Sequence, residues 1–298
     1  MMNTPAILGL TVIATLTACG SSNESQVTGV MQGRTDAVEI DNDGDEGLAL
    51  TAPEKLNLMT YRGGEVLRTP IKTQAIFWGS EWSTPKYAGD KVEGINRLLS
   101  GIGTSASLNI VGEYGATASV KHTGNSFDAS VFPTGDLTPG QAAAEVCKVT
   151  KQNPDSTTTY FIYGTKKAKA NICATHGWGN CPATGKQFLM AWFPDIDEQK
   201  CMTPDVKTKN SQALKNLANA TAHELAEILT DPRRGGWFDT GRDEIADKCA
   251  WTFPADNITL TNGSSFRLIY LWSNKAYDAG KGMANGKRLR GCVDRQFK

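Results

Sequence analysis

The 298-residue sequence lacks several features that identify common classes of protein. Its 31 Lys and Arg residues balance 31 Asp and Glu residues, and no basic block is present, so nucleic acid is not an expected partner. Beyond the N-terminal region no apolar run is long enough to span a membrane, and there is no internal repeat. Gly124-Asn125-Ser126 does not fit the G-x-S-x-G pattern, so a serine-nucleophile triad has no support.

The sequence also has no cysteine pair at C-x-x-C spacing, which argues against a thiolate metal site. Six of its seven cysteines follow Cys19, and an even number in an exported chain indicates three disulfides. The pairing is not fixed by the sequence. We predict Cys173 with Cys181, because they are close in the chain, and Cys249 with Cys292, because that bond would close the C-terminal region.

The start of the chain is typical of an export signal with lipid attachment. Residues 5–18 are almost all apolar or small, too short a run to span a bilayer, and the lipobox L-T-A-C ends at Cys19. We therefore predict a lipoprotein signal peptide over residues 1–18 and a lipid on Cys19 that anchors the chain to the membrane of the cell envelope. Gly20 favours the outer membrane in a Gram-negative cell, with the chain at the cell surface or in the periplasm. The alternative is an ordinary secretion signal followed by a chance cysteine.

Composition divides the remaining chain into two parts. Residues 19–58 are rich in Ser, Asn, Gly and Asp, which predicts a flexible tether, and residues 59–298 form one globular domain of ordinary size. Strands alternate with helices in the first two thirds of that domain, and β-rich structure follows. This order predicts an α/β to α+β fold, a mixed sheet with packed helices. The predicted strands are 71–78, 117–122, 158–163, 188–193 and 267–272, and the predicted helices are 91–102, 138–149 and 211–230.

The most informative segment is His-Glu-Leu-Ala-Glu at residues 223–227, near the end of the third predicted helix. Positions i and i+4 share one helical face, so His223 and Glu227 can hold one cation between them. Glu224 is then placed like the general base of an H-E-x-x-H metallohydrolase, except that glutamate replaces the second histidine. The pattern predicts a zincin-like active-site helix. The alternative is a structural His–Glu pair on one helix face.

A metal site needs a third ligand, and the nearest downstream acids are Glu244 and Asp247; the sequence does not decide between them. Zinc is the favoured cation, although a site rich in carboxylates also suits calcium or manganese. His176 lies between a cysteine and two glycines, in a segment that we interpret as a loop. It is a candidate for stabilising an oxyanion, with a loop histidine bonded to backbone carbonyls as the alternative.

Several segments together resemble the EXORDIUM, or phosphate-induced protein, family of plant cell-wall proteins and their microbial relatives. They are Y-R-G-G at 61–64, F-W-G-S-E-W at 77–82, C-A-T-H-G at 173–177, and T-D-P with G-W-F between 230 and 238. The resemblance implies an extracellular, cell-surface protein and no particular activity. It also implies the microbial branch, in which an H-E-x-x-E segment and a downstream acidic segment occur, whereas plant members generally lack them.

Two functions therefore remain open. The first is a surface lipoprotein that acts as a metallohydrolase, most simply a peptidase, with a peptide or cell-wall substrate and a metal-activated water. The second is a non-catalytic extracellular protein that binds cell-wall material or a partner and keeps the metal ion for structure.

Overall fold

The computed structural model describes residues 26–32, 58–168, 172–196, 201–204, 209–282 and 290–297. The predicted signal peptide over residues 1–18 and the lipid site at Cys19 fall outside these ranges. Within them, no helix has the length and apolar character needed to cross a bilayer.

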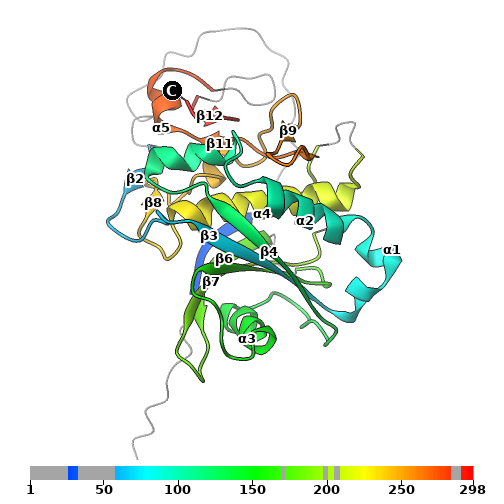
Figure 1. Cartoon of the computed structure of the whole chain (residues 1–298). Coiled ribbons are helices and arrows are strands. Elements are labelled where there is room, and N and C mark those ends of the chain that lie inside the picture. Colours follow the sequence, from blue (N-terminus) through cyan, green and yellow to red (C-terminus); the bar gives the residue numbers. More distant parts are fainter. Residues whose placement is uncertain are drawn as a thin grey trace, which may run out of the picture.

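The described chain is a mixed α/β domain built on one sheet (Figure 1). Five strands, β3 to β7, carry the sheet and β1 adds a sixth at its edge, in the order β1-β6-β7-β5-β3-β4. Strands β3, β4, β5 and β7 are parallel, whereas β6 runs antiparallel to β7 and β1 runs antiparallel to β6. The bounds are β1 Gln26–Gln32, β3 Ile71–Trp78, β4 Val120–Asp128, β5 Thr158–Tyr163, β6 Ile172–Asn180 and β7 Gln187–Phe193.

Helices cover both faces of the sheet and bury alternate side chains of each central strand. On one face, Phe161 and Tyr163 of β5 pack in the larger core with α2 (Lys91–Gly101) and α4 (Gln212–Thr230). On the other face, Tyr160 and Ile162 pack with α3 (Pro139–Val149). The α3 N-terminus carries a capping box between Thr138 and Gln141, which satisfies two backbone N–H groups at the helix start.

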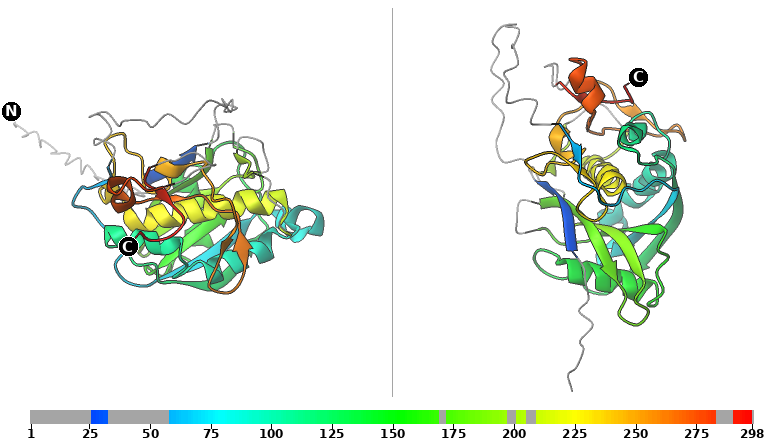
Figure 2. Two further views of the ribbon diagram at one scale, coloured as in Figure 1. Left: turned by 90° about the horizontal axis from the view of Figure 1, so that it is seen from above. Right: turned by 90° about the vertical axis from the view of Figure 1, so that its left-hand side faces the viewer.

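The chain after α4 forms a further layer on the side of that helix away from the sheet, seen as the orange and red segments in Figure 2. Its short elements include β8 (Trp237–Phe238), η5 (Asp247–Cys249), β10 (Ser265–Phe266) and β11 (Leu271–Trp272). The remaining elements are β2 Thr60–Tyr61, η2 Ser80–Ser83, α1 Pro85–Ala88, η3 Leu108–Tyr114, β9 Ile258–Thr259, α5 Asn274–Asp278 and β12 Cys292–Val293.

Most predicted elements agree with these bounds, and the main error concerns the segment around His176. The sequence suggests a loop there because of its glycines, but residues 172–180 form β6. Gly179 is needed inside this strand because α3 packs closely upon it: a Cβ at Gly179 would lie 2.7 Å from Cβ of Ala143. The predicted strand over 117–122 begins later, at Val120, and of the strand predicted over 267–272 only Leu271–Trp272 is extended.

The prediction of a flexible tether over residues 19–58 is wrong for Gln26–Gln32, which form β1 and pair with β6. Backbone pairing at a sheet edge holds this segment, and that interaction leaves no signal in hydrophobic composition. Residues 33–57, which connect β1 to the body of the domain, lie outside the described ranges.

Three disulfides are formed among the described cysteines, and two of them do not join cysteines that are nearest neighbours in the sequence. Cys249 bonds Cys292, as predicted, with a sequence separation of 43. The predicted bond between Cys173 and Cys181 is wrong. Cys173 is the second residue of the extended strand β6 and Cys181 follows its last residue, so the strand holds them apart and each bonds another partner: Cys173–Cys201 and Cys147–Cys181.

Candidate metal centre

The helix that carries the H-E-x-x-E segment lies in the centre of the molecule. Every residue of α4 from Leu214 to Thr230 is buried, because the sheet covers one side and α2, η3 and β10 cover others. The Ser211 hydroxyl caps its N-terminus by accepting from the Leu214 N–H. A helix buried all round has no solvated polar face, so the charged residues in its last turns must find partners within the protein.

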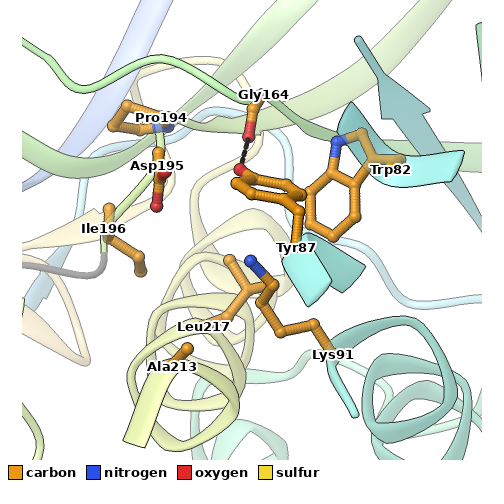
Figure 3. Close-up of a pocket in the computed structure, with 9 residues that line it drawn as sticks. All are labelled: Trp82, Tyr87, Lys91, Gly164, Pro194, Asp195, Ile196, Ala213 and Leu217. Carbon is orange, nitrogen blue, oxygen red and sulfur yellow. Dashed lines mark hydrogen bonds between the residues drawn. The ribbon is translucent and has the colours of Figure 1, made fainter. Parts of the chain in front are cut away.

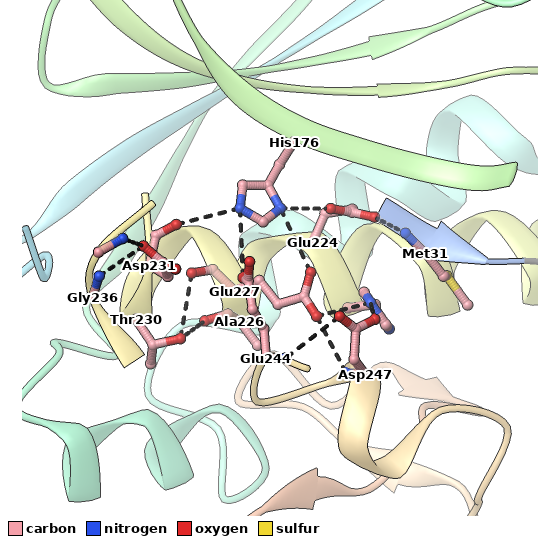
Figure 4. A network of polar contacts seen from close by, with 12 residues as sticks. Met31, His176, Glu224, Ala226, Glu227, Thr230, Asp231, Gly236, Glu244 and Asp247 are labelled. Atoms are coloured by element: carbon pink, nitrogen blue, oxygen red, sulfur yellow. Dashed lines mark hydrogen bonds and ion pairs between the residues drawn. The ribbon is translucent and has the colours of Figure 1, made fainter. Parts of the chain in front are cut away.

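Those partners form a carboxylate–histidine cluster, seen in Figure 4. Three members come from α4, one from β6 and two from the segment that ends in η5. The chain returns to α4 through a turn in which Asp231 Oδ1 accepts N–H groups from Gly235 and Gly236, both at 2.9 Å. The members of the cluster are His176, His223, Glu224, Glu227, Glu244 and Asp247.

One half of the cluster surrounds His223. Its Nε2 lies 3.0 Å from Glu227 Oε1 and 3.2 Å from Asp247 Oδ1, yet it makes a hydrogen bond with neither. A cation about 2.1 Å from each ligand atom would hold tetrahedral donors about 3 to 3.5 Å apart, which matches these separations. The Asp247 N–H also donates to Glu227 Oε1 at 3.2 Å, which fixes the two carboxylates relative to each other.

The other half surrounds His176. Its Nδ1 lies 2.8 Å from Glu224 Oε2 in a hydrogen bond and 3.5 Å from Glu227 Oε2. Its Nε2 faces the Asp231 carbonyl at 3.4 Å and Glu244 Oε2 at 3.7 Å. Both ring nitrogens therefore already face protein oxygens. The geometry supports His176 as the residue that orients Glu224, and it supports the predicted role in stabilising an oxyanion less well.

The two downstream acids, which the sequence leaves as alternatives for the third ligand, go to different halves. Asp247 joins His223 and Glu227, whereas Glu244 lies against His176. The Glu227 carboxylate divides the cluster, with Oε1 towards His223 and Oε2 towards His176. Of the two acids, Asp247 therefore fits the site formed by the helical pair.

The charge in the cluster is out of balance. Four carboxylates face two imidazoles, all buried except for the Asp247 side chain, which is 23% exposed. Several polar atoms inside it have no hydrogen-bond partner: both ring nitrogens of His223, Glu227 Oε2 and Glu244 Oε2. Buried unpaired polar atoms and excess buried charge are both costly. A divalent cation between His223, Glu227 and Asp247 would supply positive charge and engage the unpartnered Nε2, so these residues fit a metal.

The pKa values of the carboxylates also reflect the excess of buried negative charge in the cluster. Burial raises the pKa of Glu224 to about 7, against the opposing effect of His176. Burial also raises the pKa of Glu244 well above its ordinary value. Burial would raise the pKa of Glu227 as well, but the adjacent imidazoles of His223 and His176 lower it to about 2. Glu227 is therefore the carboxylate held most firmly in its charged form, as a metal ligand must be.

Access to the cluster is narrow. Asp247 is its only member with an exposed side chain, so solvent approaches from the η5 side. A pocket near the first turns of α4, lined in part by Trp82, Tyr87 and Leu217, shares no residue with the cluster (Figure 3). At Glu224, the backbone N–H of Met31 in β1 donates to Oε1 at 3.3 Å. No sequence pattern indicates this last contact, which spans 193 residues.

Neither a protein-family model nor a curated protein matches this chain. The resemblance to the EXORDIUM family therefore stays a prediction, and the functional argument depends on the geometry of the cluster.

Proposed function

We propose that this protein is a metal-dependent hydrolase in which His223, Glu227 and Asp247 hold one divalent cation. The observation that carries the proposal is the convergence of two carboxylate oxygens, from Glu227 and Asp247, at 3.0 and 3.2 Å from the buried Nε2 of His223, which makes no hydrogen bond. Zinc suits a site with one nitrogen and two carboxylate ligands, and calcium or manganese are alternatives. When bound, the cation would polarise a substrate carbonyl and lower the pKa of a water.

In this proposal Glu224 is the general base and His176 is its positioning residue. Glu224 follows the ligand His223 directly in the helix, and its Oε2 is held by His176 Nδ1 at 2.8 Å. The carboxylate can accept a proton from the attacking water and return it to the leaving group. Glu224 and His176 are both fully buried, so bulk solvent does not compete for the proton while Glu224 holds it.

Peptide or cell-wall material is the proposed substrate class, in keeping with a surface lipoprotein anchored through Cys19. The three disulfides fit an oxidising compartment outside the cytosol, where such substrates are found.

A second function is favoured by one observation, the nearly complete burial of the cluster. A closed metal site is typical of a structural ion, which needs no open position for water. The protein would then be a non-catalytic extracellular binding protein for cell-wall material or a partner.

Glu224→Gln separates the two functions. The wild-type protein, loaded with zinc and incubated with a peptide library, is expected to produce cleaved peptides that mass spectrometry detects. Loss of the base should slow cleavage by about 10² to 10⁴-fold while zinc content stays at the wild-type level. Glu145→Gln, which changes a buried glutamate on α3, is the matched control and should cleave normally. Equal cleavage by Glu224→Gln would reject the mechanism, and zinc binding without cleavage by any variant would favour the structural ion.

A further inference from the structure

The edge strand β1 lies directly on the strand that carries His176. Its register with β6 is antiparallel and places Gly29 opposite His176, and Met31 opposite Ala174. The pairing shifts between Val27 and Gly29, so that Thr28 is an extra residue next to the site. In Figure 2, right, this blue strand lies beside the green strands at the edge of the sheet.

Contacts from β1 complete the cover over the proposed general base. Met31 is 1% exposed, and its N–H donates to Glu224 Oε1 while His176 occupies Glu224 Oε2. Both oxygens of this carboxylate are thus engaged, one of them by a peptide N–H from β1. Because Glu224 is fully buried, a water or a substrate has no open path to Oε1 from the side of β1 while Met31 remains in place.

The described structure holds β1 through pairing with β6 and packing against α4 and α3, and residues 33–57 separate it from the next described residue, Leu58. If β1 left, the outer edge of β6 would present free backbone N–H and C=O groups beside Glu224. Such an edge is a template for an extended peptide, which binds by adding a strand to the sheet.

We propose that the edge of β6 next to Glu224 is a binding groove for an extended peptide and that β1 occupies it as an internal, displaceable ligand. The groove would bind peptides antiparallel to β6, through main-chain hydrogen bonds, in the register of residues 26–32. Its closeness to Glu224 assigns the substrate of the proposed hydrolase to extended peptides, so this part depends on the proposed function. It also accounts for the burial of Glu224 on the side of β1, because β1 must leave before a peptide can lie along β6 beside that carboxylate.

The test uses the full chain with a recognition sequence for a site-specific protease inserted after Asp43, within the segment between β1 and Leu58. The probe is a fluorescein-labelled peptide with the sequence of residues 24–34, and binding is followed by fluorescence anisotropy. After cleavage, the probe is expected to bind with one site per chain, and the unlabelled peptide should displace it. Before cleavage, binding should be at least about 10-fold weaker, since the attached strand competes at an effective concentration in the millimolar range.

Two control peptides test the register. A scrambled sequence should not compete. N-methylation of the Met31 amide removes the donor to Glu224 Oε1 and should weaken competition about 10-fold, whereas N-methylation near the end of the peptide, at Gln26, should have a smaller effect. Equal effects of the two N-methyl groups would contradict the proposed register.

The result that overturns the inference is a cleaved protein in which β1 does not exchange with the probe, or one that unfolds when β1 is removed by dilution, as judged by circular dichroism. Either would make β1 a fixed part of the sheet. Binding measured in chelator keeps this test separate from catalysis: exchange of the probe without hydrolysis of any peptide would support the groove and reject the hydrolase. Hydrolysis by the uncut chain without exchange would reject the groove.

Discussion

Two helices of this protein each carry buried acidic residues, and the two sites balance charge differently. On α3, Glu145 is 2% exposed, but Lys148 of the same helix donates to Asp128 and lies 3.9 Å from Glu145. Asp128, Glu145 and Lys148 together are the α3 cluster. It is nearly neutral, because Glu145 is protonated and the charge of Lys148 balances that of Asp128. In the carboxylate–histidine cluster on α4, four carboxylates face two imidazoles and several atoms have no partner. Glu145 Oε1 also lacks a hydrogen-bond partner, so the two sites differ in the excess of buried negative charge and in the unpartnered imidazole nitrogens of His223. Burial of an acid is therefore not by itself a sign of function, whereas uncompensated charge around unpartnered imidazole nitrogens is.

The largest expected difference between the two clusters concerns metal binding. Glu227→Gln removes the charged ligand shared by both halves of the α4 cluster, and we expect zinc affinity to fall at least about 100-fold. Glu145→Gln in the α3 cluster should leave the affinity unchanged. Competition with a chromophoric chelator measures both. Similar affinities for the two variants would remove the distinction between the clusters.

Two disulfides, one beside each cluster, provide a second comparison of the α4 and α3 clusters. The Cys249–Cys292 bond holds η5, which begins at the proposed ligand Asp247, whereas the Cys147–Cys181 bond lies on the α3 side of the sheet. Their sequence separations of 43 and 34 are close, so replacing either pair with serine should cost about 3 to 4 kcal/mol of stability. Only loss of the Cys249–Cys292 bond is expected to weaken zinc binding, by about 10-fold. Denaturant unfolding and chelator competition test the two parts, and equal loss of zinc affinity in both variants would be contrary evidence.

The last expected difference is the pH dependence that Glu145 contributes to stability in the α3 cluster. Burial, reinforced by Asp128, raises the pKa of Glu145 from 4.5 to about 8. Because the folded-state pKa is the higher one, the stabilising contribution is complete below pH 4.5 and is lost as the pH rises through 8. Glu145→Gln has no proton to lose, so relative to the wild type it should gain stability of up to about 4 kcal/mol between pH 5 and 9. Urea unfolding at both pH values measures this, and a difference that does not change with pH would show that Glu145 does not titrate.

The sequence predicts the parts of this fold that depend on local patterns. Strand β5 over Thr158–Tyr163 and helix α4 over Gln212–Thr230 agree with their predicted positions, because a continuous apolar run and a 3.6-residue period are local signals. The strand at His176 is hidden by its glycines, of which Gly179 is required by the close approach of α3. Strand β1 was hidden because its partner is about 150 residues away in the sequence.

Some residues of the candidate site can likewise be predicted from the sequence, whereas other parts of the site depend on tertiary packing. His223, Glu224 and Glu227 are recognisable from helical spacing, and Asp247 from its closeness downstream. The contacts of His176 with Glu224 and of Met31 with the same carboxylate depend on tertiary packing alone. These contacts change the proposed role of His176 and reveal the cover over the site.

Elemental analysis of the purified protein tests the central claim most directly. The account predicts one zinc, manganese or calcium ion per wild-type chain, none in His223→Ala, and one in His122→Ala, whose histidine bonds Asn96 outside the cluster. A wild-type chain that binds none of these ions, or a His223→Ala variant that retains its ion, would contradict it.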